Sequence, residues 1–143
     1  MEGTPSVGLQ EAVLKALSNW KDCNTRSRRS EFWWVWLVIV IIEAIVNALS
    51  TIVGQSVPII LYIFGLIALV FGICALCVMI PLGIRRLHDT GKTGWLILLA
   101  FIPILNIVFL ILCALDSQRE SNEYGPSPKY SSSSGGYSSS NMI

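Results

Sequence analysis

The sequence predicts an all-α integral membrane protein: a helical bundle with three transmembrane helices, an N-terminal amphipathic surface helix and a disordered C-terminal tail. Hydrophobic residues make up 53% of its 143 residues and charged residues only 13%, about half the charged share of a typical soluble domain. No charged residue occurs in residues 44–84 or 93–115. Such apolar blocks are typical of lipid-embedded helices. They leave too little chain for a separate soluble catalytic domain.

Residues 1–31 are predicted to form the surface helix and a basic stretch next to the membrane. Between Val7 and Asp22, large apolar side chains recur at helical spacing, namely Leu9, Val13, Leu17 and Trp20. We expect this helix to lie along the membrane surface. About thirty polar or mixed residues precede the first long apolar run, a pattern that does not fit a cleaved signal peptide.

Residues 32–115 are predicted to form the transmembrane domain, with spans at about 32–53, 57–80 and 94–115. The first run is about 33 Å long as a helix, which is enough to cross the hydrocarbon core. The tryptophans at its start, Trp33, Trp34 and Trp36, suit the membrane interface. Because Pro103 and Asn106 interrupt the third run, a re-entrant hairpin of two half-helices is the alternative to a third crossing.

The distribution of basic residues predicts the orientation. They precede the first span and lie between the second and third, whereas the loop between the first and second has none. The positive-inside tendency therefore places the N-terminus in the cytoplasm. Three crossings would put the polar tail, residues 116–143, outside, and the hairpin would return it to the cytoplasm. From about residue 131 the tail is serine-rich, low-complexity sequence that we expect to be disordered.

Three polar motifs flank the apolar runs. They are Arg26-Ser27-Arg28-Arg29-Ser30-Glu31-Phe32-Trp33, Arg85-Arg86-Leu87-His88-Asp89-Thr90-Gly91 with Gly94-Trp95, and Asn122-Glu123-Tyr124-Gly125-Pro126-Ser127-Pro128-Lys129. Over residues 13–36 and 81–129 the chain thereby resembles the domain-of-unknown-function-805 family of small bacterial inner-membrane proteins. One departure is Thr25, where the family usually has a glycine. The resemblance implies a multi-pass helical protein of the bacterial plasma (inner) membrane, in a family without an established reaction.

The two arginine-bearing motifs predict one basic site at the level of the lipid headgroups. Guanidinium groups bind phosphate or carboxylate in a bidentate manner, which suits anionic headgroups. We further predict that Glu31 or Asp89 pairs with an arginine of the other motif. The alternative is that the arginines only fix the topology, Asp89 caps a helix or pairs with an arginine, and His88 is a wetted loop residue. The predicted site comprises Arg26, Arg28, Arg29, Glu31, Arg85, Arg86, His88 and Asp89.

The apolar runs also contain three notable polar side chains, those of Glu43, Asn47 and Asn106. An ionised carboxylate is costly in the hydrocarbon core, so Glu43 should face protein or water. Asn47 follows four residues later, on the same face of the helix. Two interpretations stay open: a proton or ion relay, and a protonated carboxyl that bonds to Asn47 or Asn106 as part of the packing.

Signals for other chemistries are missing from the sequence. It contains no phosphate-binding glycine loop, no zinc-ligand spacing and no nucleophile elbow. We therefore expect no cofactor, no metal and no nucleic-acid partner. Cys74, Cys77 and Cys113 lie inside apolar runs and are interpreted as small apolar fillers. Residues 122–126, with asparagine, glycine and proline, predict a turn.

The favoured functional hypothesis is a non-enzymatic scaffold or regulator that binds anionic lipid or a membrane-protein partner through the basic site. Two alternatives come from other classes. A small oligomeric transport or permeation protein would use Glu43, and a lipid-headgroup enzyme would use His88 as its base. Expected partners are anionic membrane lipids, with a second copy of the chain or another membrane protein as alternatives.

Overall fold

The structure, a computed structural model, describes residues 5–54 and 58–130. Its elements are α1 (Leu9–Ser18), α2 (Arg29–Gly54), α3 (Pro58–Asp89), the 3₁₀-helix η1 (Gly94–Phe101) and α4 (Pro103–Ala114). Within the described part the chain is all-helical, with one isolated β-bridge between Asn122 and Gly125. The all-α prediction is confirmed. The predicted disorder from residue 131 lies outside the described residues.

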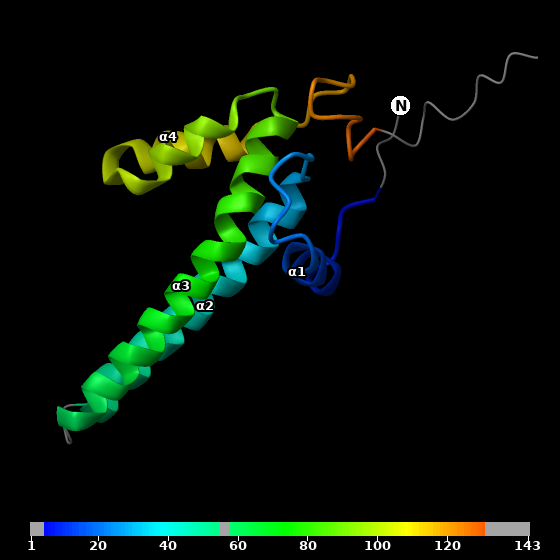
Figure 1. The fold of residues 1–143 in the computed structure, drawn as a ribbon. Coiled ribbons are helices and arrows are strands. Elements are labelled where there is room, and N and C mark those ends of the chain that lie inside the picture. Colours follow the sequence, from blue (N-terminus) through cyan, green and yellow to red (C-terminus); the bar gives the residue numbers. More distant parts are fainter. Residues whose placement is uncertain (1–4, 55–57, 131–143) are drawn as a thin grey trace, which may run out of the picture.

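The two long helices, α2 and α3, run side by side along most of their length (Figure 1). They have 26 and 32 residues, which correspond to lengths of about 39 Å and about 48 Å. Both exceed the thickness of the hydrocarbon core, about 30 Å. Both are also apolar enough to cross a membrane. Helix α3 continues through Pro81, whose missing N–H removes one backbone hydrogen bond without ending the helix.

A glycine motif ends α3. The backbone N–H of Lys92 donates to Leu87 O at 2.9 Å, and that of Gly91 donates to His88 O at 3.0 Å. These two bonds form a Schellman motif, which needs a left-handed residue after the helix. Gly91 supplies it with a φ of 71°. Asp89 is thereby fixed as the last helical residue.

The third apolar run does not form one helix, so a third crossing at residues 94–115 is not confirmed. The run divides at Ile102, which is extended, and α4 begins at Pro103. Proline disfavours helical conformation in the residue before it, which explains the break. Helix α4 has 12 residues, about 18 Å of helix. The amide of Asn106 donates to Ala100 O at 2.8 Å and ties the two pieces together.

The two short helices fold back on each other and project to one side from the C-terminal end of α3 (Figure 1). This is the arrangement of two half-helices that the hairpin alternative requires. Phe32 of α2 and Phe109 of α4 pack with ring centroids 6.1 Å apart. At Gly83, an added Cβ would lie 2.7 Å from Ile97 Cδ1, so the glycine allows η1 to approach α3 closely. The packed core therefore lies at this end of the spans.

Helix α1 packs against α2. Its prediction as a helix is confirmed. The face that packs against α2 differs from most of the stripe of large apolar side chains that is predicted to lie along the membrane surface. Ala12 and Ala16 are fully buried, whereas Leu9, Leu17 and Trp20 are exposed. The small alanines allow close approach to α2. The larger side chains are left on the outward face of the molecule.

Candidate functional site

The carboxylate of Asp89 is the centre of a buried group that we call the arginine–aspartate cluster, formed by Arg26, Ser27, Arg86, Asp89 and Ser117. Asp89 Oδ1 lies 3.0 Å from Arg26 Nε and from Nη2. Asp89 Oδ2 lies 2.5 Å from Arg86 Nη1 and also accepts a hydrogen bond from the Ser117 hydroxyl. All five residues are buried. Two guanidinium groups thus share one carboxylate, with hydrogen bonds that satisfy both oxygens.

Arg26 joins three segments that are far apart in the sequence. Besides Asp89, its guanidinium donates to three carbonyls of the tail, at Gln118 (2.9 Å), Glu120 (3.0 Å) and Gly125 (3.1 Å). The loop that carries Arg26 is shaped by Asp22, whose carboxylate accepts from the Thr25 hydroxyl at 2.6 Å. That hydrogen bond holds the pKa of Asp22 below its usual value. The fork of the arginine therefore attaches the tail to the end of α3.

Arg86 plays a similar part for α4. Its Nε donates to Cys113 O at 2.9 Å and its Nη2 donates to Leu115 O. Carbonyls at the C-terminal end of a helix lack partners within that helix. Arg86 supplies donors there, so the end of α4 is held beside the end of α3.

A second buried ion group lies beside the first. Glu31, on the first turn of α2, is fully buried, and its Oε2 lies 2.9 Å from Lys15 Nζ of α1. Its Oε1 lies 3.7 Å from Arg85 Nη2. The predicted pairing between the two motifs is therefore confirmed twice, by Arg26 with Asp89 and by Arg85 with Glu31. Sequence reasoning missed Lys15, because the packing of α1 against the first turn of α2 has no local signal.

His88 is packed rather than wetted, so its assignment to a solvated loop is wrong. Its side chain is buried, and its ring stacks on Tyr124 with centroids 3.6 Å apart and an interplanar angle of 2°. The Asn122 amide donates to His88 O at 2.9 Å. The predicted turn at residues 122–126 is confirmed, since Tyr124 N donates to Asn122 Oδ1 at 3.0 Å and Gly125 has a φ of 110°.

The predicted eight-residue site is thus divided in two by burial. Arg26, Arg85 and Arg86 are buried together with Glu31, His88 and Asp89. Their charged groups contact one another, backbone carbonyls and the tail. The carboxylate of Asp89 accepts from two arginines and a serine, so it is not aligned with His88 for acid–base chemistry. Only Arg28 and Arg29 of the predicted set line an open pocket.

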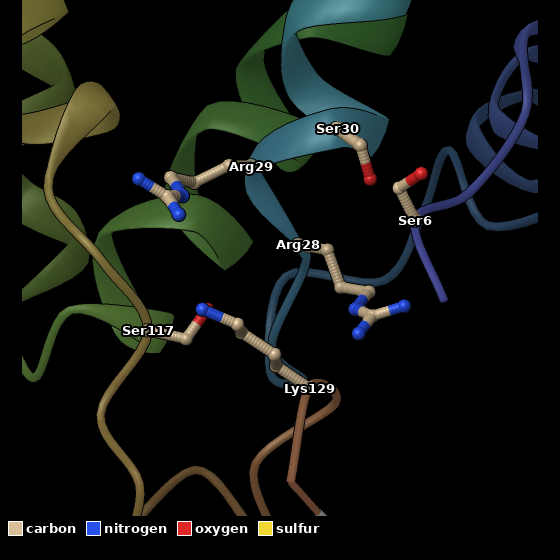
Figure 2. Close-up of a pocket in the computed structure, with 6 residues that line it drawn as sticks. All are labelled: Ser6, Arg28, Arg29, Ser30, Ser117 and Lys129. Carbon is tan, nitrogen blue, oxygen red and sulfur yellow. The ribbon is translucent and has the colours of Figure 1, made fainter. Parts of the chain in front are cut away.

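That pocket, which we call the basic pocket, has a volume of about 150 Å³ and is lined by Ser6, Arg28, Arg29, Ser30, Ser117 and Lys129. Figure 2 shows that these residues come from the N-terminal segment, the start of α2 and the tail. Three of them are cationic and three carry hydroxyls. Sequence reasoning missed Lys129 as a member of the site, although it is the last residue of the third motif.

One carboxylate adjoins the basic pocket. Asp116 Oδ1 lies 3.2 Å from Arg29 Nη2 and 2.9 Å from Lys129 Nζ. The hydrogen bond from Lys129 holds the pKa of Asp116 below its usual value. Asp116 is half exposed, so these pairs are screened by solvent. The pocket is lined by three cations and adjoins one carboxylate, so it keeps an excess of positive charge.

The residues that the structure describes form no site for a metal ion, and their cysteines are unpaired. No group of three or more histidine, cysteine, aspartate or glutamate side chains lies close enough to hold a metal ion there. Cys23, Cys74, Cys77 and Cys113 are free thiols. Cys74 and Cys77 are exposed on α3, and Cys113 is buried on α4.

Two long apolar helices whose ends meet in a buried ionic cluster are the features of a small helical membrane protein. The chain belongs to the family described as "Protein of unknown function (DUF805)", which matches residues 20–126. It is 32% identical over 120 residues to inner membrane protein YhaI of Escherichia coli (strain K12), covering 83% of this chain and 96% of the relative. It is 30% identical over 118 residues to inner membrane protein YhaH of the same strain, covering 81% and 94%.

No solved structure shows a significant match. The resemblance inferred from the three motifs is therefore confirmed, and both relatives are named inner membrane proteins. The family description assigns no catalytic reaction. The function must be argued from the geometry of the site.

Proposed function

We propose that this protein is a non-enzymatic membrane scaffold or regulator that holds a phosphate-bearing anionic headgroup in the basic pocket. The observation that carries the proposal is that Arg28, Arg29 and Lys129 line one pocket together with the hydroxyl-bearing Ser6 and Ser30. Forked guanidiniums and hydroxyls are the donors that bind phosphate oxygens in proteins. The pocket also adjoins the first turn of α2, whose helix dipole favours an anion.

The buried clusters support this proposal by fixing the pocket in advance. Ser27 N donates to Arg85 O at 3.1 Å, immediately before the two arginines of the pocket. Ser117 lies between the arginine–aspartate cluster and the pocket, because its hydroxyl donates to Asp89 while its side chain lines the cavity. A preorganised site loses less entropy on binding. Arg26, Arg85, Arg86 and Asp89 are in this view positioning residues rather than ligands.

The proposed topology has two crossings with both described ends of the chain on one side, the cytoplasm. The tail starts beside the end of α3, since Gln118 N donates to Asp89 O at 3.0 Å. Residue 26 lies at the same end through its pair with Asp89. The excess of basic residues at this end supports a cytoplasmic position. A fluorescent reporter fused after Ile143 should therefore be active in the cytoplasm, and a phosphatase inserted after Gly54 should be active outside. The reverse result would exclude this topology.

Binding to vesicles tests the proposed ligand. Full-length protein should bind phosphatidylglycerol vesicles in preference to neutral phosphatidylcholine vesicles, and Arg28→Gln should weaken that preference about fivefold, since a basic residue near an anionic surface contributes about 1 kcal/mol. Lys92→Gln, an exposed cation outside the pocket, is the matched control. Competition by inorganic phosphate distinguishes a free-phosphate site from a headgroup site. Equal binding by Arg28→Gln and wild-type protein would contradict the proposal.

A further inference from the structure

A groove runs between α2 and α3, and its lining shares no residue with the basic pocket. Its volume is about 520 Å³, within the range of about 300–1,000 Å³ that small-molecule sites occupy. Apart from one carboxylate, Glu43, its lining side chains are apolar, and they include Trp36, Leu69 and Met79. Small residues of α3, Ala68 and Gly72, form part of its wall.

The carboxyl group of Glu43 has no hydrogen-bond or ion-pair partner among the described residues. The Asn47 amide donates instead to the backbone oxygen of Glu43, at 2.8 Å. The Asn106 amide donates to Ala100 O. The two side chains that could have satisfied this carboxyl therefore bond elsewhere. The interpretation of Glu43 as an internally bonded packing residue is not supported.

The carboxyl of Glu43 lies beside Gly72 of α3. A Cβ added at Gly72 would lie 3.8 Å from Glu43 Oε1, so the carboxyl sits over the glycine face of α3. Glu43 is half-buried near the middle of α2. The carboxyl thus points into the groove at the depth of the hydrocarbon core, where no water is available to solvate it.

A lone carboxylate in such a groove selects the chemistry of its ligand. Hard metal cations require several oxygen ligands, and the groove offers those of one side chain. An organic cation needs only one counter-ion, and its apolar groups can replace lipid along the walls. Tryptophan rings attract cations, and Trp36 lines the groove. A carboxylate within the hydrocarbon core is energetically costly, so its presence there indicates a functional site.

We propose that the Glu43 groove binds a monovalent lipophilic organic cation, with Glu43 as its counter-ion and the walls of α2 and α3 as its apolar cradle. This inference goes beyond the anionic-headgroup function and does not depend on it. The two sites lie at different depths, use different residues and bind ligands of opposite charge. Failure of one leaves the other intact.

Tetraphenylphosphonium is a suitable probe, and titration calorimetry of the full chain in mild detergent measures its binding. Wild-type protein should bind it, and Glu43→Gln should bind it at least tenfold more weakly. Gly72→Leu keeps the carboxylate but fills the groove, and it should weaken binding similarly. Glu11→Gln, an exposed acid on α1, should have no effect. Helix content and elution volume identify any variant that fails to fold.

Three results would overturn the proposal. Absence of binding by folded wild-type protein, or equal binding by Glu43→Gln, removes it. If native mass spectrometry instead shows a cation-free dimer that Gly72→Leu converts to a monomer, the groove is an interface for a second copy and the proposal is wrong. Binding of anionic vesicles by Glu43→Gln should stay unchanged, which separates this test from that of the basic pocket.

Discussion

Nε of Arg26 lies 3.0 Å from Oδ1 of Asp89, although 63 residues separate the two along the chain. The pair connects the loop before α2 to the last residue of α3, and the same guanidinium holds the tail. Buried ion pairs are poor evidence of net stability, because desolvation offsets much of their attraction. Their geometry is nevertheless specific. This pair is well suited to fixing which end of each helix meets which.

Asp89→Asn should destabilise the fold strongly. It would leave the guanidiniums of Arg26 and Arg86 buried without their shared counter-ion. Breaking a buried pair by removing one partner costs about 3–5 kcal/mol. Thermal unfolding in detergent measures the effect, and Glu11→Gln, an exposed acid, serves as control. A melting temperature equal to that of the wild type would show that the cluster is solvated and not buried.

Arg26→Lys should release the tail while leaving α2 and α3 in place. Lysine keeps the charge but lacks the fork that reaches the carbonyls of Gln118, Glu120 and Gly125. Trypsin should therefore cleave after the exposed Arg119 several times faster than in the wild type. Lys21→Arg, an exposed substitution before the loop, should not change this rate. Unaltered cleavage in Arg26→Lys would mean that other contacts hold the tail.

Two glycine substitutions should have opposite effects. Gly91→Ala places a side chain at a φ of 71°, and its Cβ would meet the side chain of Gln118. The expected cost is about 1–2 kcal/mol from the left-handed conformation alone. Gly65 lies inside α3 with open space around it, so Gly65→Ala should be neutral or stabilise the helix by up to about 1 kcal/mol. Thermal unfolding compares both, and equal effects would contradict the assignment of Gly91 to the helix end.

The local features of this fold could be predicted from the sequence because each depends on neighbouring residues. The first two apolar runs form the two long helices. Asn122 and Gly125 specify the turn at residues 122–126 of the tail. The pairing of Glu31 and Asp89 with arginines of the other motif followed from placing both motifs on one side of the membrane. That step needed only the positions of the basic residues and the parity of the crossings.

Burial could not be predicted in the same way. From the sequence alone, arginines next to apolar runs are expected to bind lipid headgroups. In the structure, however, Arg85 and Arg86 are only 2% and 0% exposed. Arg86 is held against the end of α4 and Arg85 lies beside Glu31 of α2, and both are tertiary contacts without a local signal. The third apolar run has the length of a span, but the break at Ile102 depends on Pro103 and on packing against α3.

Asp116→Asn and Lys129→Gln should change vesicle binding in opposite directions. Asp116 is the carboxylate that competes with an anionic ligand for Arg29 and Lys129. Its removal should strengthen binding to phosphatidylglycerol vesicles, and loss of the Lys129 charge should weaken it. Each change should amount to about fivefold or less, since a charge near an anionic surface contributes about 1 kcal/mol. Flotation with the vesicles measures both variants, and Lys92→Gln is again the control.

Acidification should loosen the tail in the same way as the substitution Asp116→Asn, because both remove the charge of this carboxylate. The hydrogen bond from Lys129 holds the pKa of Asp116 below its usual value of 3.8. The contribution of this carboxylate to tail attachment is therefore fully present above pH 3.8 and is lost as the pH falls through the lowered pKa. Trypsin is inactive in this range, so pepsin cleavage of the tail is the readout. Wild-type protein should lose protection below pH 3.8, and Asp116→Asn, which has no such carboxylate, should show no matching step. A step of equal size in both would assign the transition to another acid.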